Sequence, residues 1–469
     1  MADDAIKAKL DKIYAAHFPD VKAVVACERL SGGASQETYR ITVETDAGNV
    51  PHAMRRSPGG VIVEDVVGHP GLATEARLMQ VARSAGVPEP EVYHVLTPED
   101  DLGDGFIMQW IEGEALGARI NRSDAFAGLR PRLAYACGEI MARIHSIDLD
   151  DSGLRDRLDE VSPEQFVRQT WERYQALETP QPMIDYAALW LLDNLPENFT
   201  PSLVHNDFRN GNFMVSPDEI VAVLDWELAH IGDPMRDLGW ICVNSWRFGN
   251  TDPVGGFGSY EDLFRGYESV TGQPVDIDAV KFWEVFGSFW WSVGCLGMAE
   301  HYRNGPDKTV ERPAIGRRSS ECQVDCINLL MPGAVDLIQV DDQPSDVDMP
   351  RAEELITSVR DFLRQDVMSE TSGRTNFMAR VASNSLDIVL REWQLGELTK
   401  QQELAGLASL LGESGDLSSL RWQLVQQLRS GERSLADESL QTHLRNTVVS
   451  QIAIDQPKYT GFKQALKKA

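Results

Sequence analysis

The most informative segment of the chain is LVHNDFRNGNFMV, residues Leu203–Val215. It contains the pattern H-x-D-x-x-x-x-N as His205, Asp207 and Asn212, between two short apolar runs. Thirteen residues after Asn212, the apolar run VAVL leads to Asp225 in LDWE. Since Asp and Asn also favour turns, a chance surface loop is the alternative interpretation of the pattern alone. The apolar runs on both sides of the pattern, and the second aspartate at this spacing, favour a functional site over a chance loop.

Phosphoryl transfer from ATP with Mg²⁺ requires these residue types. One carboxylate orients the attacking hydroxyl and accepts its proton, which suits Asp207. A carboxamide and a second carboxylate hold magnesium on the nucleotide phosphates, which suits Asn212 and Asp225. The flanking apolar runs predict short strands, and in-line transfer needs such a rigid mount. The segment therefore predicts a phosphotransferase that uses ATP and Mg²⁺.

With these motifs the chain resembles the aminoglycoside phosphotransferase family of small-molecule kinases, over roughly residues 20–330. Within that family it looks closest to the kinase-like domains associated with acyl-CoA dehydrogenases. The resemblance implies an α+β, bilobal, protein-kinase-like fold, in which Asp207 is the catalytic base and Asn212 and Asp225 are the metal ligands. Residues 351–468 are similar to an uncharacterised helical domain that is appended to such kinases.

The resemblance also implies nucleotide-binding residues near the N-terminus. Gly32 and Gly33 in LSGGASQETY let backbone approach a phosphate closely, and Ser35 can donate a hydrogen bond to it. An ordinary hairpin turn is the alternative reading of this segment. Arg55 stands where many kinases place a lysine against the phosphates, and its planar fork is bulkier than an ammonium group. Phosphate pairing by Arg55 is expected, and its geometry is left open.

Three further positions complete this set. Glu75, on a helix predicted at Gly71–Ala85, matches the acid that pairs with the phosphate-binding cation, although a solvated helix charge is the alternative. Gln109 and Ile111 flank Trp110 and resemble the hinge whose backbone holds adenine. Trp110 is otherwise a simple core aromatic.

Downstream, GDPMRDL resembles the D-P-x-x-D segment of the family. Asp237 is expected to accept N–H bonds from the catalytic loop, and Asp233 to cap the helix that follows. His205 is expected to support the loop rather than carry a proton, because Asp207 already fills the role of base.

The acceptor site is the least defined part of the prediction. The aromatic candidates, which would equally form a helical core, are Trp240, Trp246, Tyr260, Trp283, Trp290, Trp291 and Tyr302. Arg317 and Arg318 would meet an anionic substrate such as a CoA thioester, or form ion pairs with Glu321 and its neighbours. The resemblance implies a hydroxyacyl-CoA as the acceptor, whereas the negative charge of residues 1–330 favours a cationic or neutral acceptor such as an aminoglycoside-like alcohol, and the choice is left open.

Composition limits the partners. Lys+Arg 44 against Asp+Glu 72 gives a formal net charge of −28, which disfavours binding to nucleic acid and to anionic membrane surfaces. Residues 331–469 carry 15 basic and 20 acidic residues, so most of the excess lies before them. The acidic start MADDAIKAKLDK does not resemble a signal peptide, and a cytoplasmic location is expected.

The patterning predicts four regions: a nucleotide-binding N-lobe at 1–112, a helical C-lobe with the catalytic loop at 113–331, a linker at 332–350, and a helical accessory domain at 351–469. Few apolar contacts are expected to cross the linker, so residues 1–332 alone should keep nucleotide binding. The accessory domain is a candidate site for homo-oligomer formation or for a partner protein. The predicted function is phosphorylation of a small-molecule hydroxyl; the alternative is a weakly catalytic pseudokinase that serves as a nucleotide-binding scaffold.

Overall fold

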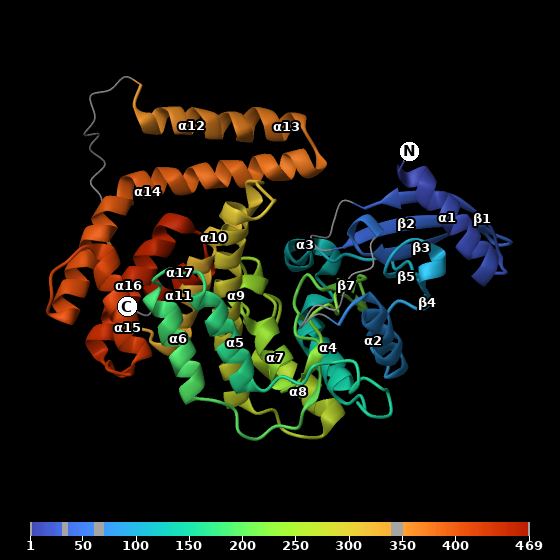
Figure 1. Ribbon diagram of the computed structural model, residues 1–469, viewed down its shortest axis with the longest axis horizontal. Helices are drawn as coiled ribbons and strands as arrows, with labels where there is room; N and C mark the ends of the chain where they lie inside the picture. Colours follow the sequence, from blue (N-terminus) through green and yellow to red (C-terminus); the bar gives the residue numbers. More distant parts are fainter. Residues whose placement is uncertain (1, 31–35, 61–69, 339–349, 468–469) are drawn as a thin grey trace. The chain divides into compact units, whose positions relative to one another are not determined.

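The computed structural model of the 469-residue chain describes residues 2–30, 36–60, 70–338 and 350–467 (Figure 1). Two compact units make up the chain. Unit 1 comprises Met1–Ser162, Asn198–Cys242 and Trp246–Val280, and unit 2 comprises Pro163–Glu197, Val243–Ser245 and Lys281–Ala469. The domain boundaries expected from the sequence remain predictions.

Unit 1 begins with a five-stranded antiparallel sheet of order β1-β2-β3-β5-β4. Its strands are β1 (Val21–Arg29), β2 (Glu37–Thr45), β3 (Gly48–Arg56), β4 (Val92–Val95) and β5 (Gly105–Gln109). Alternation of buried and partly exposed positions along β2 places Tyr39, Ile41 and Val43 in the core. A period of two residues is what a strand with one buried face requires.

Two helices accompany this sheet in Figure 1. Helix α1 (Ala2–His17) packs Leu10 and Tyr14 into the same apolar core as Ile41 and Val43. Helix α2 (Leu72–Ser84) packs on β4 and β5 and carries Glu75 in its first turn. The short 3₁₀ turns of this region are Pro58–Gly60 and Pro98–Asp100 (η2).

The rest of unit 1 supports the catalytic segment. Two small antiparallel sheets pair β6 (Ser202–Val204) with β9 (His230–Gly232) and β7 (Phe213–Val215) with β8 (Ile220–Val223). The helices are α3 (Gly117–Arg122), α4 (Arg130–His145), α7 (Met235–Cys242) and α8 (Tyr260–Thr271), with 3₁₀ turns at Asp124–Phe126 and Asn244–Arg247. Helices α4 and α8 approach closely because they meet at glycines: a Cβ on Gly138 would lie 2.2 Å from the Leu263 carbonyl oxygen. The residues that the sequence predicts to be catalytic are thus held between short strands and packed helices.

Unit 2 is helical. Its helices are α5 (Pro163–Gln175), α6 (Pro182–Asp193), α9 (Ile277–Asn304, beginning in unit 1), α10 (Glu311–Arg317), α11 (Ser319–Leu330), α12 (Ala352–Phe362), α13 (Met368–Glu370), α14 (Gly373–Leu411), α15 (Leu417–Arg429), α16 (Glu438–Asp455) and α17 (Thr460–Lys467), with a π-helical turn at Leu363–Val367. Among the described helices, none is both long and apolar enough to cross a bilayer. The apolar stretch at 285–299 is part of α9, where Phe286 packs against Phe166 of α5.

The helices beyond residue 350 pack on earlier helices of unit 2, contrary to expectation. Helix α6 packs on α15, and α11 packs on α16 and α17. Apolar side chains such as Leu191, Leu424 and Val448 are buried. The expectation that few apolar contacts cross residues 332–350 is therefore wrong, because α15, α16 and α17 pack against α6 and α11.

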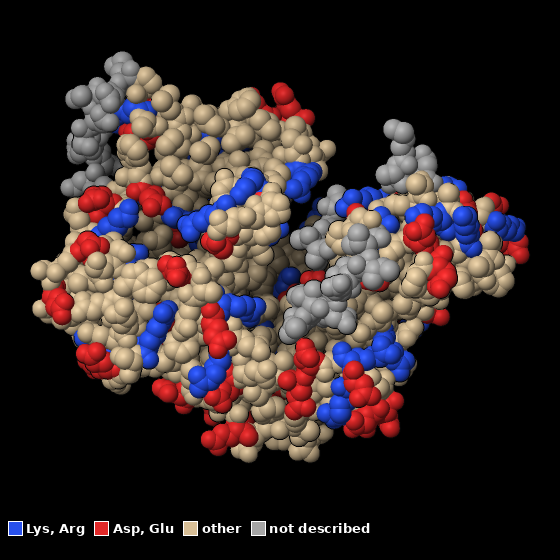
Figure 2. Space-filling model, viewed as in Figure 1, with Lys and Arg blue, Asp and Glu red and all other residues tan. Residues whose placement is uncertain are grey.

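The surface charge is mixed. On the face drawn in Figure 2, Lys and Arg side chains are interspersed with Asp and Glu. The net charge of −28 is therefore not gathered into one acidic surface on that face.

Candidate active site

The loop between β6 and β7, which carries the H-x-D-x-x-x-x-N pattern, is hydrogen-bonded to one buried carboxylate. Asp237 of α7 accepts hydrogen bonds from the backbone N–H groups of His205 at 2.9 Å and Asn206 at 2.7 Å. His145 of α4 lies 3.0 Å from the same carboxylate. Burial acts to raise the pKa of Asp237, but the hydrogen bonds from His145 and His205 outweigh it and hold the pKa below its usual range. The carboxylate therefore stays charged and fixes the loop, as the sequence predicted.

The loop also has a strained turn that the side chains stabilise. Asn206 has φ +66°, in the left-handed region that Asn tolerates better than most residues. Its side-chain oxygen accepts a hydrogen bond from the buried Arg236 at 2.9 Å, and its amide donates to the Leu228 carbonyl at 3.2 Å. The turn directs the following residue, Asp207, toward the surface of the loop.

Asp207 is held by three donors. Its Oδ1 accepts from the Trp240 indole N–H at 2.8 Å and from Arg209 Nε at 3.0 Å, and its Oδ2 accepts from the Asn212 side-chain amide. The Arg209 guanidinium lies over the Trp246 ring, 4.2 Å from its centroid. The Asp207 side chain is 14% exposed, so it is accessible but not free to rotate. This is the arrangement that a carboxylate needs to orient an acceptor hydroxyl.

The second aspartate lies next to the catalytic loop. Residue Asp225 follows β8 with φ +72°, and the backbone N–H of its neighbour Leu224 donates to the Asn212 carbonyl at 2.8 Å. His205 also reaches this segment, since its Nε2 lies 3.1 Å from the Leu224 carbonyl. Burial lowers the pKa of His205, which supports a neutral, structural imidazole. The pattern H-x-D-x-x-x-x-N and the later Asp thus form one hydrogen-bonded structure.

A network of opposite charges joins the sheet to this aspartate. Arg55 Nη2 of β3 lies 2.5 Å from Asp225 Oδ1 and 3.7 Å from Glu75 Oε2 of α2. Gln36 accepts from Arg55 and donates to Glu75 at 3.0 Å. Burial raises the pKa of Glu75 to about 7 despite the nearby arginine. Burial alone would lower the pKa of Arg55, but the charges of Glu75 and Asp225 raise it.

The remaining predicted residues lie elsewhere. Gln109 ends β5 and its backbone N–H donates to the Glu91 carbonyl at 2.8 Å, while Ile111 follows in the segment before α3. Among the described residues, no hydrogen bond joins these two to the network around Arg55. Gly32, Gly33 and Ser35 lie outside the described residues. Their roles and those of the other site residues remain predictions.

The candidates for acceptor binding divide into two groups. Trp240 and Trp246 lie at the catalytic loop, on Asp207 and Arg209 respectively. Trp283, by contrast, belongs to the aromatic core of unit 2 and is 1% exposed. The two arginines form ion pairs: Arg317 with Glu392 and Asp455, and Arg318 with Glu321. The ion-pair interpretation of these arginines therefore describes the structure.

Sequence reasoning missed two residues of the site, Arg209 and Gln36. Arg209 lies inside the H-x-D-x-x-x-x-N pattern, two residues after Asp207, but the pattern does not tell which way the side chain points. Gln36 follows the glycine-bearing segment, and its contacts to Arg55 and Glu75 come from elements far along the chain.

Comparison with known proteins identifies the family of the chain. The pattern of the phosphotransferase enzyme family matches residues 26–272, just over half of the chain, and that of a domain of unknown function matches residues 369–459. Acyl-CoA dehydrogenase family member 10 of Mus musculus is 30% identical over 278 residues, which are 55% of this chain and 25% of the relative. Acyl-CoA dehydrogenase family member 11 of Pongo abelii is 24% identical over 456 residues, which are 90% of this chain and 55% of the relative. The chain thus spans about half, or less, of the length of these curated relatives.

Among solved structures, a "putative aminoglycoside phosphotransferase" from Ralstonia eutropha is similar, with a TM-score of 0.55 and 23% identity. The similarity covers 67% of this chain and 95% of that chain. The kinase-like fold expected from the sequence, with an antiparallel N-terminal sheet and a large helical region after it, is confirmed. By the extent of the family match and by this fold, the chain belongs to the phosphotransferase enzyme family.

Proposed function

We propose that this protein transfers the γ-phosphoryl group of ATP to a hydroxyl group of a small molecule. The observation that carries the proposal is a series of contacts: Asp207 with Asn212, the Asn212 carbonyl with the backbone N–H of Leu224 next to Asp225, and Asp225 with Arg55. These contacts join the residues that we propose as base, metal ligands and phosphate-pairing cation. The cytoplasmic location expected from the sequence remains part of the proposal.

The transfer step needs one proton acceptor. The acceptor hydroxyl oxygen forms a bond to the γ-phosphorus while the bond from that phosphorus to the bridging oxygen of ADP breaks. Asp207 takes the proton that the hydroxyl releases. Because Trp240 and Asn212 hold the two carboxylate oxygens, Asp207 meets the hydroxyl in a fixed orientation.

The donor set near Asp225 suits Mg²⁺. A carboxylate oxygen of Asp225 and the amide oxygen of Asn212 are hard oxygen ligands, and Asn212 uses its N–H groups on Asp207. Bound there, magnesium would neutralise charge on the phosphates. Arg55 pairs with Asp225 in this structure, and its guanidinium is the cation that we propose to pair with a nucleotide phosphate.

One observation favours a second function, a nucleotide-binding scaffold without turnover. The Arg55 guanidinium lies directly on a proposed metal ligand, at 2.5 Å from Asp225. If that ion pair persisted with nucleotide bound, Asp225 would not reach magnesium. Turnover separates the two functions, since a scaffold binds nucleotide and releases no ADP.

We propose a hydroxyacyl-CoA as the acceptor, in preference to an aminoglycoside-like alcohol. The relatives that match the chain carry the name acyl-CoA dehydrogenase. Arg209 lies beside Asp207 and rests on Trp246, where its cation suits an acceptor that carries negative charge.

The proposal is tested by incubating the full chain with Mg²⁺ and ATP in the presence of hydroxyacyl-CoA esters. A separate incubation contains an aminoglycoside-like amino alcohol such as kanamycin. ADP release and the mass of the acceptor are followed together. We expect ADP release that depends on a hydroxyacyl-CoA, and a phosphorylated thioester product. Phosphorylated amino alcohol alone would contradict the acceptor assignment, and nucleotide binding without turnover on any acceptor would favour the scaffold.

A further inference from the structure

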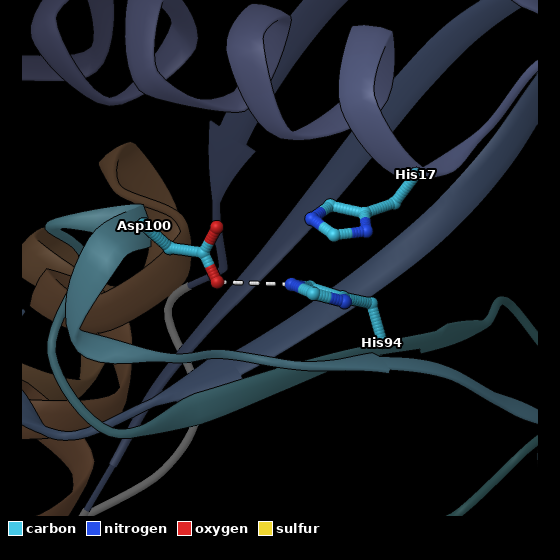
Figure 3. A group of neighbouring side chains, drawn as sticks. All are labelled: His17, His94 and Asp100. Atoms are coloured by element: carbon cyan, nitrogen blue, oxygen red, sulfur yellow. Dashed lines mark hydrogen bonds and ion pairs between the residues drawn. The ribbon is translucent and has the colours of Figure 1, made fainter.

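Two histidines and an aspartate converge on the N-terminal sheet, away from the residues proposed for catalysis. His17 ends α1, His94 lies in β4, and Asp100 ends the turn η2. One donor atom from each side chain lies within 4.8 Å of the other two. Figure 3 shows the two imidazole rings and the carboxylate facing one shared space.

The carboxylate of this cluster is fixed in place by its own turn. Oδ2 of Asp100 accepts from the Thr97 backbone N–H at 2.8 Å and from the Thr97 hydroxyl at 3.2 Å. Nε2 of His94 lies 2.9 Å from the same oxygen. The side chains of His94 and Asp100 are 12% and 8% exposed. Two donors are therefore positioned in advance, with little side-chain freedom left to lose.

The third donor comes from the end of a helix. His17 is in the last turn of α1. The unpaired carbonyl groups at the C-terminal end of a helix stabilise a nearby cation, and a metal ion bound by His17 would be such a cation. Its ring stacks on the His94 ring, with centroids 4.3 Å apart and planes 26° apart. His17 is exposed, and one of its ring nitrogens lies within 4.8 Å of the donor atoms of His94 and Asp100.

A hydrogen bond explains the contact of His94 with Asp100 but gives no role to the imidazole stacked on it. Two imidazole nitrogens and one carboxylate oxygen are a frequent ligand set for Zn²⁺ and similar ions, at about 2.0–2.2 Å from the metal. Two adjacent ligands at such bond lengths lie about 3 Å apart. The 2.9 Å between His94 and Asp100 already matches that separation.

We infer that His17, His94 and Asp100 form a binding site for a divalent transition-metal ion such as Zn²⁺. Two of its three ligand atoms are imidazole nitrogens, whereas the ligands proposed for Mg²⁺ at Asp225 and Asn212 are oxygen atoms. Its ligands join the end of α1 to β4 and the turn η2. Beside it, Tyr14 and Phe18 pack on His52 of β3. A bound ion therefore fastens the N-terminal helix to the sheet and stabilises unit 1.

The experiment is titration of the metal-free full chain with ZnCl₂ by calorimetry, with Mg²⁺ present throughout to occupy hard oxygen sites. The variants are His17→Ala and Asp100→Asn, and the matched control is His301→Ala, which removes an exposed histidine of α9. We expect the wild type and the control to bind one equivalent of Zn²⁺ that both site variants bind at least about 10-fold more weakly. Circular dichroism confirms that each variant is folded.

A second readout reports the ligand geometry. Co²⁺ in place of Zn²⁺ should give visible absorption bands of a four- or five-coordinate site in the wild type and the control, and these bands should be lost in His17→Ala. Zn²⁺ should also raise the unfolding temperature of the wild type but not of His17→Ala. Equal Zn²⁺ affinity and equal Co²⁺ spectra in the wild type and His17→Ala would overturn the inference, as would no Zn²⁺ binding to the wild type.

Discussion

The guanidinium group of Arg55 makes several of the charged contacts of the site. Arg55 contacts Gln36, Glu75 and Asp225, which come from three different parts of the chain. A lysine at this position would offer one ammonium group and could not satisfy these acceptors in fixed directions. The arginine therefore keeps the charge that a nucleotide phosphate needs and also orders the acids around it.

Substitution of Arg55 should weaken nucleotide binding in two steps. Arg55→Lys keeps the positive charge but loses the planar guanidinium that can donate two parallel hydrogen bonds. We therefore expect the affinity for a non-hydrolysable ATP analogue to fall by about 10-fold. Arg55→Ala loses the charge as well and should cost about 1.5–3 kcal/mol, the range for a hydrogen bond to a charged group. Isothermal calorimetry measures both, with Arg119→Ala on the exposed side of α3 as the control. Equal affinities for Arg55→Ala and Arg119→Ala would contradict the role of Arg55.

A buried histidine makes stability depend on pH. Burial lowers the pKa of His230 in β9 from 6.5 to about 4. Between these values the unfolded chain binds a proton that the folded chain does not, so the stability present above pH 6.5 is lost as the pH falls toward 4. From pH 7.5 to 5 the wild type should lose about 2 kcal/mol more unfolding free energy than His230→Gln.

Urea unfolding at the two pH values measures that difference. His301→Gln, at an exposed position, should lose as much stability as the wild type. If His230→Gln and the wild type showed the same pH dependence, His230 would titrate normally in the folded protein.

At the scale of elements, α7 holds the catalytic loop through Asp237. Removal of this carboxylate in Asp237→Ala would leave the buried N–H groups of His205 and Asn206 without their acceptor. Each such loss costs about 1–3 kcal/mol. We therefore expect a lower free energy of unfolding and a lower kcat together, measured by urea titration and ADP release. Asp278→Ala, an exposed acid in the first turn of α9, is the control and should change neither.

The hydrogen bonds at the start of α7 could be predicted from the sequence. The resemblance of GDPMRDL to the D-P-x-x-D segment of the family implied a helix cap at Asp233 and a loop anchor at Asp237, and both are found: Asp233 accepts from the Met235 backbone N–H at 2.9 Å. His145, which also binds Asp237, lies 92 residues away on α4, and no local pattern brings it there. Likewise, the direction of Arg209 depends on the position of Trp246, which the motif does not encode. Local hydrogen bonding was predictable, while contacts between distant elements depend on tertiary packing.

At the scale of the whole molecule, the helices after residue 350 belong with earlier helices of the chain. Arg429 of α15 lies 2.7 Å from Asp185 of α6, a residue with a fully buried side chain. Tyr459 donates to Asp325 of α11 at 2.6 Å, and the Gly461 carbonyl accepts from Asn328 at 2.9 Å. The expectation of few apolar contacts across residues 332–350 was wrong, because charge balance does not report on the apolar faces of the helices on either side of the linker. The domain boundaries themselves remain predictions.

Breaking the Asp185–Arg429 pair should therefore destabilise unit 2. Arg429→Ala leaves a buried carboxylate without its cation, a change that costs about 3–5 kcal/mol. Arg168→Ala removes an exposed i,i+4 pair with Glu164 and should cost at most about 1 kcal/mol. Thermal and urea unfolding of the full chain distinguish the two. Equal stability of these variants would mean that α15 does not depend on its contact with α6.

The most direct test of the phosphotransferase mechanism compares Asp207→Asn with Asp225→Ala. Both are titrated with a non-hydrolysable ATP analogue, with and without Mg²⁺, and their turnover is measured in parallel. Asp207 acts only during transfer, so Asp207→Asn should keep its affinity for the Mg²⁺-bound analogue and lose about 10²–10⁴ in kcat. Asp225→Ala should lose the part of the affinity that depends on Mg²⁺. Loss of nucleotide binding in Asp207→Asn, with normal Mg²⁺-dependent binding in Asp225→Ala, would contradict the assigned roles.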